Sequence, residues 1–151
     1  MFPRGCIQAR VLRHLGLFAL RSADHESRDE HDPPGGDDLH LGNFQEAIDY
    51  LDKYSKKDKV IGSLAIGATG DAYVELGDLD KGVAKYVEAA DYAKNSFNSP
   101  LYLMKAAEIY EMQNKYTDAL NLYQRIQDEY PESTEGSTIE KYIARVKILI
   151  K

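Results

Sequence analysis

The chain has 151 residues, of which 43% are hydrophobic, so it is long enough to bury one ordinary globular core. Its formal net charge of −6 argues against a nucleic-acid partner, because binding phosphates requires clustered lysine and arginine. The single cysteine, Cys6, excludes an internal disulfide. No run of about 18 apolar residues occurs, so we expect no membrane span.

Residues 1–40 differ in composition from the rest of the chain. They hold all 4 histidines, whereas all 11 tyrosines come later. The segment Pro33-Pro34-Gly35-Gly36 favours a linker, because proline stops helices and glycine is costly to fix. We therefore expect residues 1–40 to be a non-repeat region, disordered or a short amphipathic helix followed by a linker. Our hypothesis is that this region is not native to the repeat domain that we expect over residues 41–151.

The start of the chain is also a candidate targeting segment. Its longest uninterrupted apolar stretch, residues 15–20, is too short for a secretory signal peptide. A weak amphipathic transit-like segment is the alternative. The sequence assigns no compartment.

A sequence pattern recurs three times after residue 40. LGNFQEAIDYLDKY starts at Leu41, LGDLDKGVAKYVEA at Leu76, and the more divergent MQNKYTDALNLYQR at Met112. Repeats of this period are typical of stacked helical hairpins. Gly77 and Asn114 stand where a leading helix ends, and both residue types suit the left-handed conformation of a helix C-terminus.

In chain order, we expect helices over about residues 44–54, 63–76, 80–95, 100–113, 116–130 and 138–150. Ser63 is the expected N-cap of the second helix, and Pro100 suits the first turn of the fourth. The first copy lacks a leading helix, so its helix should leave Phe44, Ile48 and Leu51 partly exposed. We expect either a marginal fold or a dimer that seals this edge.

Small and large side chains alternate in the same register in successive copies. The small residues are Gly70 and Ala107 in the leading helices, and Ala47, Gly82 and Ala119 in the second helices. The large residues that follow them are Tyr73, Tyr110, Leu51, Tyr86 and Tyr123. Small residues let helix backbones approach, and the large side chain fills the remaining space.

This register, with Pro131 closing the third copy, resembles the tetratricopeptide repeat family over about residues 41–132. The resemblance implies an all-α, tetratricopeptide-like stack of antiparallel helical hairpins, a short α-solenoid. The helix near the C-terminus would be its capping helix. The resemblance further implies a non-catalytic module that binds a peptide or a partner protein in a concave groove.

Carried over by register, the resemblance implies a groove formed by the leading helices. Its residues are Leu64, Gly67, Asp71, Val74, Glu75, Leu101, Met104, Lys105, Glu108, Glu111 and Met112. Four carboxylates against one lysine, among apolar side chains, suit a peptide with basic and apolar residues. The alternative is that these charges are only the solvated face of two helices.

Other functions receive less support. Acid pairs on the leading helices could suggest acid–base catalysis, but the repeats hold no histidine and no flanking nucleophile, so we expect no enzyme. His25, His31 and His40 lack regular ligand spacing, so we expect no metal and no cofactor. Two further alternatives are self-assembly through the incomplete first repeat, and the soluble part of a membrane-anchored bacterial envelope protein that assists protein translocation or assembly.

Overall fold

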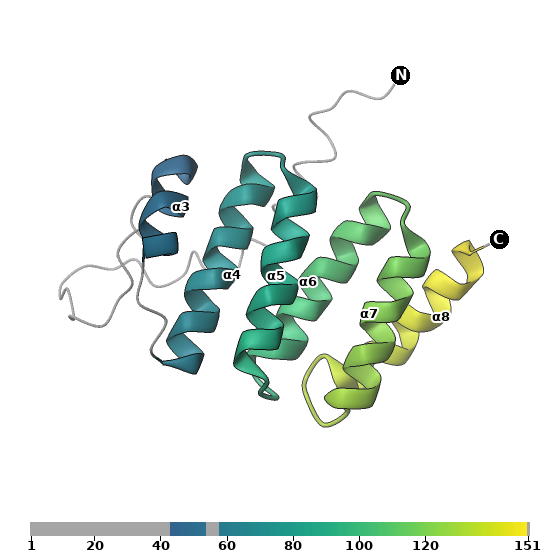
Figure 1. Ribbon diagram of the computed structural model, residues 1–151. Coiled ribbons are helices and arrows are strands. Elements are labelled where there is room, and N and C mark those ends of the chain that lie inside the picture. Colours follow the sequence, from purple (N-terminus) through teal and green to yellow (C-terminus); the bar gives the residue numbers. More distant parts are fainter. Residues whose placement is uncertain (1–42, 54–57, 151) are drawn as a thin grey trace, which may run out of the picture. The chain divides into compact units, whose positions relative to one another are not determined.

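The computed structural model describes residues 43–53 and 58–150. Over these residues the chain forms helices and no strand, as predicted. The helices are α3 (Phe44–Lys53), α4 (Lys59–Glu75), α5 (Leu79–Ala93), α6 (Asn98–Met112), α7 (Tyr116–Glu129), the short 3-10 helix η1 (Gly136–Thr138) and α8 (Ile139–Leu149) (Figure 1). The predictions for residues 1–40 lie outside the described residues. None of the described helices is long and apolar enough to cross a membrane.

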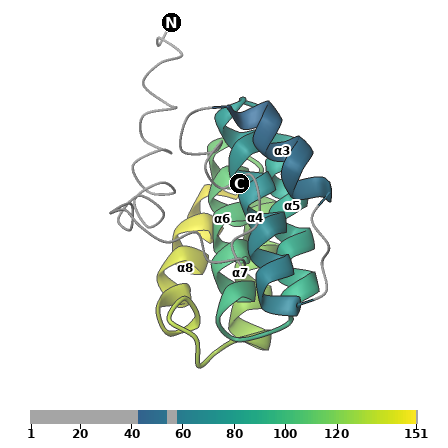
Figure 2. The same ribbon diagram turned by 90° about the vertical axis from the view of Figure 1, so that its left-hand side faces the viewer.

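The helices stack in chain order, each against the next, and form two layers (Figures 1 and 2). One layer contains α4, α6 and α8, which are joined by the ion pairs Asp71–Lys105 and Glu111–Arg145. The other contains α3, α5 and α7, in which Arg125 of α7 pairs with Asp91 of α5. The predicted stack of helical hairpins is therefore confirmed.

Left-handed residues end the leading helices, as predicted. Gly77 has a φ of 83° and Asn114 a φ of 59°. In each case the next amide donates a hydrogen bond back to a tyrosine carbonyl, from Asp78 to Tyr73 at 2.9 Å and from Lys115 to Tyr110 at 2.8 Å. These bonds satisfy carbonyls that the end of a helix leaves open.

The start of α4 differs from the prediction. The helix begins four residues earlier, because the carboxylate of Asp58 accepts hydrogen bonds from the backbone amides of Val60 at 2.8 Å and Ile61 at 2.9 Å. The prediction that Ser63 is the N-cap is wrong. Ser63 is fully buried within the helix, and its hydroxyl accepts a hydrogen bond from Nδ2 of Asn98 at 3.1 Å.

The small residues allow close helix contacts, as expected. A Cβ atom added at Gly70 would lie 2.8 Å from the ring of Tyr86 and 3.3 Å from the carbonyl oxygen of Gly82. Tyr86 and Tyr123 are fully buried. The backbones of α4 and α5 thus approach where both lack a side chain, and the Tyr86 ring occupies the space beside them.

The tyrosines of the leading helices behave differently from the prediction. Tyr73 and Tyr110 are only half-buried, and the ammonium groups of Lys81 and Lys115 lie 5.2 Å and 5.7 Å from their ring centres. Tyr102, which the repeat register did not single out, is 5% exposed and belongs to the core. Tyr73 and Tyr110 lie near the ends of their helices, where a phenol can stay in water, whereas Tyr102 lies between the two packed layers and is covered.

The N-terminal end of the stack is more closed than the sequence suggested. Ile48 and Leu51 of α3 are each 2% exposed, so the expectation that they are partly open is wrong. Phe44 is half-buried. At the other end, α8 covers the last hairpin as the predicted capping helix, burying Ile139, Ile143 and Val146.

Candidate protein-binding face

The predicted groove residues lie on α4 and α6, in the layer that also contains α8 (Figure 2). Their spacing of three or four residues places them on one side of each helix. Leu64 is 45% exposed and Leu101 37% exposed. The half-buried residues are Asp71, Val74, Glu75, Met104, Lys105, Glu108, Glu111 and Met112. We call this surface the α4–α6 face.

Gly67 contributes no surface to this face. It is buried, and a Cβ atom added to it would lie 2.2 Å from Cε1 and Cζ of Tyr102. The glycine therefore makes room for an aromatic ring from α6, and this ring stacks on that of Tyr86 at 6.1 Å between centroids. At this position the face is closed by Tyr102.

Asp71 joins the two layers and two repeats at one point. Its carboxylate accepts hydrogen bonds from the hydroxyl of Tyr86 on α5 and from Nζ of Lys105 on α6, the latter at 2.7 Å. The Lys105 ammonium also lies 5.2 Å from the Tyr86 ring centre and 6.0 Å from that of Tyr102. The Lys105 side chain is only 15% exposed, so this lysine is part of the packing and not a free cation of the face.

Glu111 repeats this arrangement one hairpin later. Its carboxylate accepts a hydrogen bond from the Tyr123 hydroxyl at 2.6 Å and pairs with Arg145 of α8 at 2.6 Å. In both cases acid and cation are 34 residues apart, so each pair joins neighbouring repeats. Asp71 and Glu111 thus each pair with a cation, and the cation of Glu111 comes from α8, which the sequence reasoning had left out of the groove.

The remaining two carboxylates of the prediction are Glu75, the last residue of α4, and Glu108 of α6. Partial burial raises the pKa of Glu75, and the neighbouring Asp71 carboxylate raises it further. Glu108 lies close enough to Tyr123 to contribute to its raised pKa. Both carboxylates lie near the C-terminal ends of their helices.

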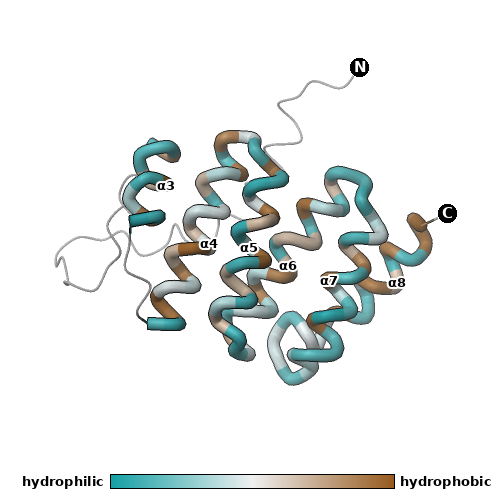
Figure 3. Tube along the Cα trace, viewed as in Figure 1, coloured by the Kyte–Doolittle hydropathy of each residue, from teal (hydrophilic) through white to brown (hydrophobic). Residues whose placement is uncertain are grey.

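An apolar patch lies at the opposite end of this face. It consists of Val60 and Leu64 in the first turns of α4, with Phe97 and Leu101 at the start of α6. Their exposed fractions are 48%, 45%, 81% and 37%. The hydrogen bond between Asn98 and Ser63 holds the two helix starts together. In Figure 3, α4 has more hydrophobic stretches than α7, which is largely hydrophilic.

Sequence reasoning found only Leu64 and Leu101 of this patch. It missed Val60 and Phe97 because it began the helices at Ser63 and Pro100. The signal was present: each missed residue stands four positions before a predicted groove residue, which is the same side of a helix.

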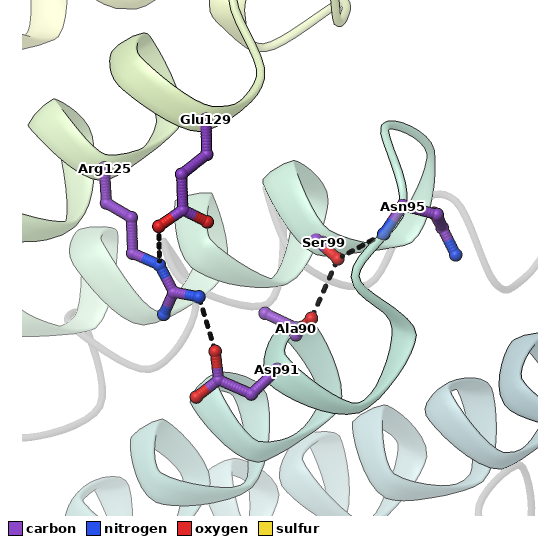
Figure 4. A network of polar contacts seen from close by, with 6 residues as sticks. All are labelled: Ala90, Asp91, Asn95, Ser99, Arg125 and Glu129. Carbon is purple, nitrogen blue, oxygen red and sulfur yellow. Dashed lines mark hydrogen bonds and ion pairs between the residues drawn. The ribbon is translucent and has the colours of Figure 1, made fainter.

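The surface of α5 and α7, in the other layer, is polar, and an ion pair joins these two helices. Arg125 bonds to Glu129 at 2.9 Å and also to Asp91 of the preceding repeat (Figure 4). In the same region, the hydroxyl of Ser99 donates to the Ala90 carbonyl at 2.8 Å and closes the turn between α5 and α6. Within the described residues, neither α5 nor α7 exposes a large hydrophobic side chain.

The buried tyrosines make the fold sensitive to alkali. Burial is the main cause that raises the pKa values of Tyr86, Tyr102 and Tyr123, and the carboxylates of Asp71 and Glu111 add to it. An unfolded tyrosine loses its proton near pH 10, so the stabilising effect of neutral burial is complete below that pH and falls above it. We expect the free energy of unfolding to fall by about 1.4 kcal/mol per pH unit for each such tyrosine.

Denaturant unfolding at a series of alkaline pH values measures this slope, and the Tyr86→Phe variant should show a shallower one. The expectation fails if tyrosinate absorbance develops fully near pH 10 while the helical circular dichroism signal is unchanged.

The comparisons with known proteins agree with this architecture. The sequence model of the tetratricopeptide repeat family matches residues 68–134, from the middle of α4 to just beyond α7. Residues 68–134 are therefore a tetratricopeptide repeat region. No curated protein matches it. Tetratricopeptide repeats generally mediate protein–protein interactions, and the family is typically non-catalytic.

Proposed function

We propose that this tetratricopeptide repeat chain is a non-catalytic module that binds a peptide or a partner protein on its α4–α6 face. One observation carries the proposal. Four exposed apolar side chains lie in the first turns of α4 and α6 or directly before them, whereas α5 and α7 on the other layer expose no large hydrophobic side chain. Exposed apolar residues gathered in one place, with charges beside them, are typical of interaction surfaces.

The chemistry of the face defines the class of partner. Removing apolar surface from water supplies affinity, at about 25 cal/mol for each Å² buried. The carboxylates at the helix ends select a partner that carries lysine or arginine and guide its approach. The residues that would contact it include Leu64, Leu101, Met104, Glu75 and Glu108.

A charge reversal tests this proposal against a matched control. Binding of an array of basic and apolar peptides is compared for wild type, for Glu75→Lys with Glu108→Lys, and for Asp128→Lys with Glu132→Lys. The control residues are exposed and lie at and after the end of α7. We expect the first pair to weaken binding about tenfold or more, which corresponds to about 1.4 kcal/mol, and the control pair to change it little. Equal losses in both would indicate non-specific attraction and contradict the proposal.

Self-assembly through the first repeat gains no support from the described residues, because Ile48 and Leu51 at that edge are buried.

A further inference from the structure

We propose that the outer side of α8 is a second interaction surface, which accepts an acidic amphipathic helix from a partner protein. α8 is the last helix of the stack (Figure 1). This surface is separate from the α4–α6 face, and the inference does not depend on the function proposed for that face. It rests on the place of α8 in the repeat, on the side chains left uncovered there, and on their charge.

α8 has the register of a leading helix. Gly70 of α4 and Ala107 of α6 are equivalent small residues that stand 37 positions apart. The same interval relates the buried residues of α6 to those of α8, so that Tyr102, Ala106 and Ile109 correspond to Ile139, Ile143 and Val146. Both sets belong to one hydrophobic core. α8 therefore packs on α7 with the same side that α6 packs on α5.

The side on which a leading helix receives its second helix is uncovered in α8. In α4 and α6 the small residue of this side, Gly70 or Ala107, is buried. A Cβ atom added at Gly70 would lie 2.8 Å from the Tyr86 ring of α5. The equivalent residue of α8 is Ala144, and it is exposed. Because small residues let helix backbones approach, Ala144 marks the place of a helix that the described residues do not supply.

An apolar residue lies one turn beyond Ala144 on the same side. Ile148 is 78% exposed, and its equivalent in α4 is Val74. Cγ2 of Val74 would lie 2.6 Å from a Cβ atom added at Gly82 of α5, so this position contacts a second helix. Ala144 and Ile148 form what we call the α8 seam. Its register distinguishes it from other exposed apolar residues, such as Leu76, because it stands where α4 and α6 each receive a helix.

The side chains around the α8 seam are mainly basic. α8 carries three exposed cations, Lys141, Arg145 and Lys147, against one carboxylate, Glu140. Arg145 pairs with Glu111 at 2.6 Å, so the two lysines are the cations that a partner would chiefly meet. A helix that lies along the seam therefore matches it best when carboxylates flank its own apolar residues.

The same register argues against a helix of a second copy as the occupant. In the first complete hairpin, the hydroxyl of Tyr86 on the second helix donates to Asp71 of the leading helix. Arg145 of α8 stands at the position equivalent to Asp71. A second helix of this array would bring a tyrosine hydroxyl to a guanidinium, whereas an aspartate or glutamate there would accept its hydrogen bonds.

The test uses two synthetic, alanine-rich peptides of about 18 residues, long enough to form helix in isolation. Both carry an alanine and a leucine four residues apart on one side. The positions that flank this pair are glutamates in one peptide and lysines in the other. Fluorescence anisotropy with the full chain should show the glutamate peptide binding about tenfold tighter or more.

A charge reversal assigns this preference to α8. Lys141→Glu with Lys147→Glu should weaken binding of the glutamate peptide about tenfold or more and strengthen binding of the lysine peptide. The matched control is Lys59→Glu with Lys94→Glu, which makes the same change in net charge at exposed lysines of α4 and at the end of α5. The control should change the affinity of either peptide little.

A substitution in the seam tests the close approach of the two helices. Ala144 is exposed, so Ala144→Gln should leave the denaturation midpoint unchanged while it weakens the glutamate peptide about tenfold or more. Leu64→Ser is the control for the α4–α6 face, and it should leave the affinity of this peptide unchanged.

The outcomes separate this inference from the proposed function. Equal binding of the two peptides, no saturable binding of the glutamate peptide, or an affinity unchanged by Ala144→Gln would overturn it. If Leu64→Ser weakens the peptide and the α8 variants do not, the peptide occupies the α4–α6 face, and only the inference about α8 is wrong. If Ala144→Gln converts a concentration-dependent dimer into a monomer, a second copy occupies the seam, and the inference is again overturned.

Discussion

Replacing Tyr123 by alanine should lower the free energy of unfolding by about 3–5 kcal/mol, the usual cost of removing a fully buried aromatic side chain. The Tyr123 ring packs against that of Tyr142 of α8 at 5.5 Å, and its hydroxyl donates to Glu111 of α6 at 2.6 Å. Its loss would therefore affect three helices at once. Against a total stability of about 5–15 kcal/mol, we expect a much lower denaturation midpoint or an unfolded chain at ambient temperature.

Two variants make this result interpretable. Tyr50→Ala removes a tyrosine that is 49% exposed on α3, and should change stability by about 0.5 kcal/mol or less. Tyr123→Phe keeps the ring and removes only the bond to the Glu111 carboxylate, for which about 1.5–3 kcal/mol is usual. Urea denaturation of the three variants gives the comparison, and a Tyr123→Ala cost no larger than that of Tyr50→Ala would show that this packing account is wrong.

Gly67→Ala should destabilise the chain by about 1–3 kcal/mol, although alanine is the better helix former by about 1 kcal/mol. The added methyl group would lie 2.2 Å from Cε1 and Cζ of Tyr102 and 2.3 Å from its hydroxyl, so the ring has to leave its buried position. The steric cost arises at the place where Tyr102 covers the α4–α6 face.

A double-mutant cycle isolates that contact. In a Tyr102→Leu background the obstruction is relieved, so Gly67→Ala should become neutral or stabilising, with a coupling of about 1–3 kcal/mol between the two sites. The measurement is the change in denaturation midpoint at constant slope for all four proteins. If Gly67→Ala costs the same in both backgrounds, the clash with Tyr102 is not its cause.

Much of the fold was predictable because the repeat places the same kinds of residue at the same few positions of each copy. Gly77 and Asn114 ended helices as expected, since their conformation depends on local backbone preference. The start of α4 was not predictable from Ser63, because a serine in an apolar helix looks like a cap until its cross-repeat partner, Asn98, is known. Local signals fix helix ends only when no tertiary contact uses the same residue.

The sequence predicted which side of the helices the candidate residues share, but not how their charges are paired. The repeat register put Leu64, Leu101 and the carboxylates on one side of their helices, where the structure also has them. The pairing of Glu111 with Arg145 and of Asp71 with Lys105 required knowing that neighbouring repeats bring residues 34 positions apart into contact. Counting charges on single helices therefore overestimated the acidity of the face.

These pairs also show what the repeat spacing does in the structure, which is to bring an acid of one helix to a cation of the next helix in the same layer. Asp71 and Glu111 each receive a tyrosine hydroxyl from the following helix and a cation from the next leading helix. The pair of Asp71 with Lys105 is partly buried and multiply bonded, so it is more strongly coupled than an exposed pair such as Lys115 with Asp80. We interpret the pairs of Asp71 and Glu111 as contacts that fix the orientation of successive hairpins beneath the face.

The measurement that tests the binding account most directly is a nuclear magnetic resonance titration of the full chain with a peptide that carries leucine and lysine residues, read as chemical-shift changes for each backbone amide. The account predicts that the largest changes fall at the starts of α4 and α6, around Leu64 and Leu101, and at their ends, around Glu75 and Glu108. Saturable changes centred on α5 and α7 instead would contradict it.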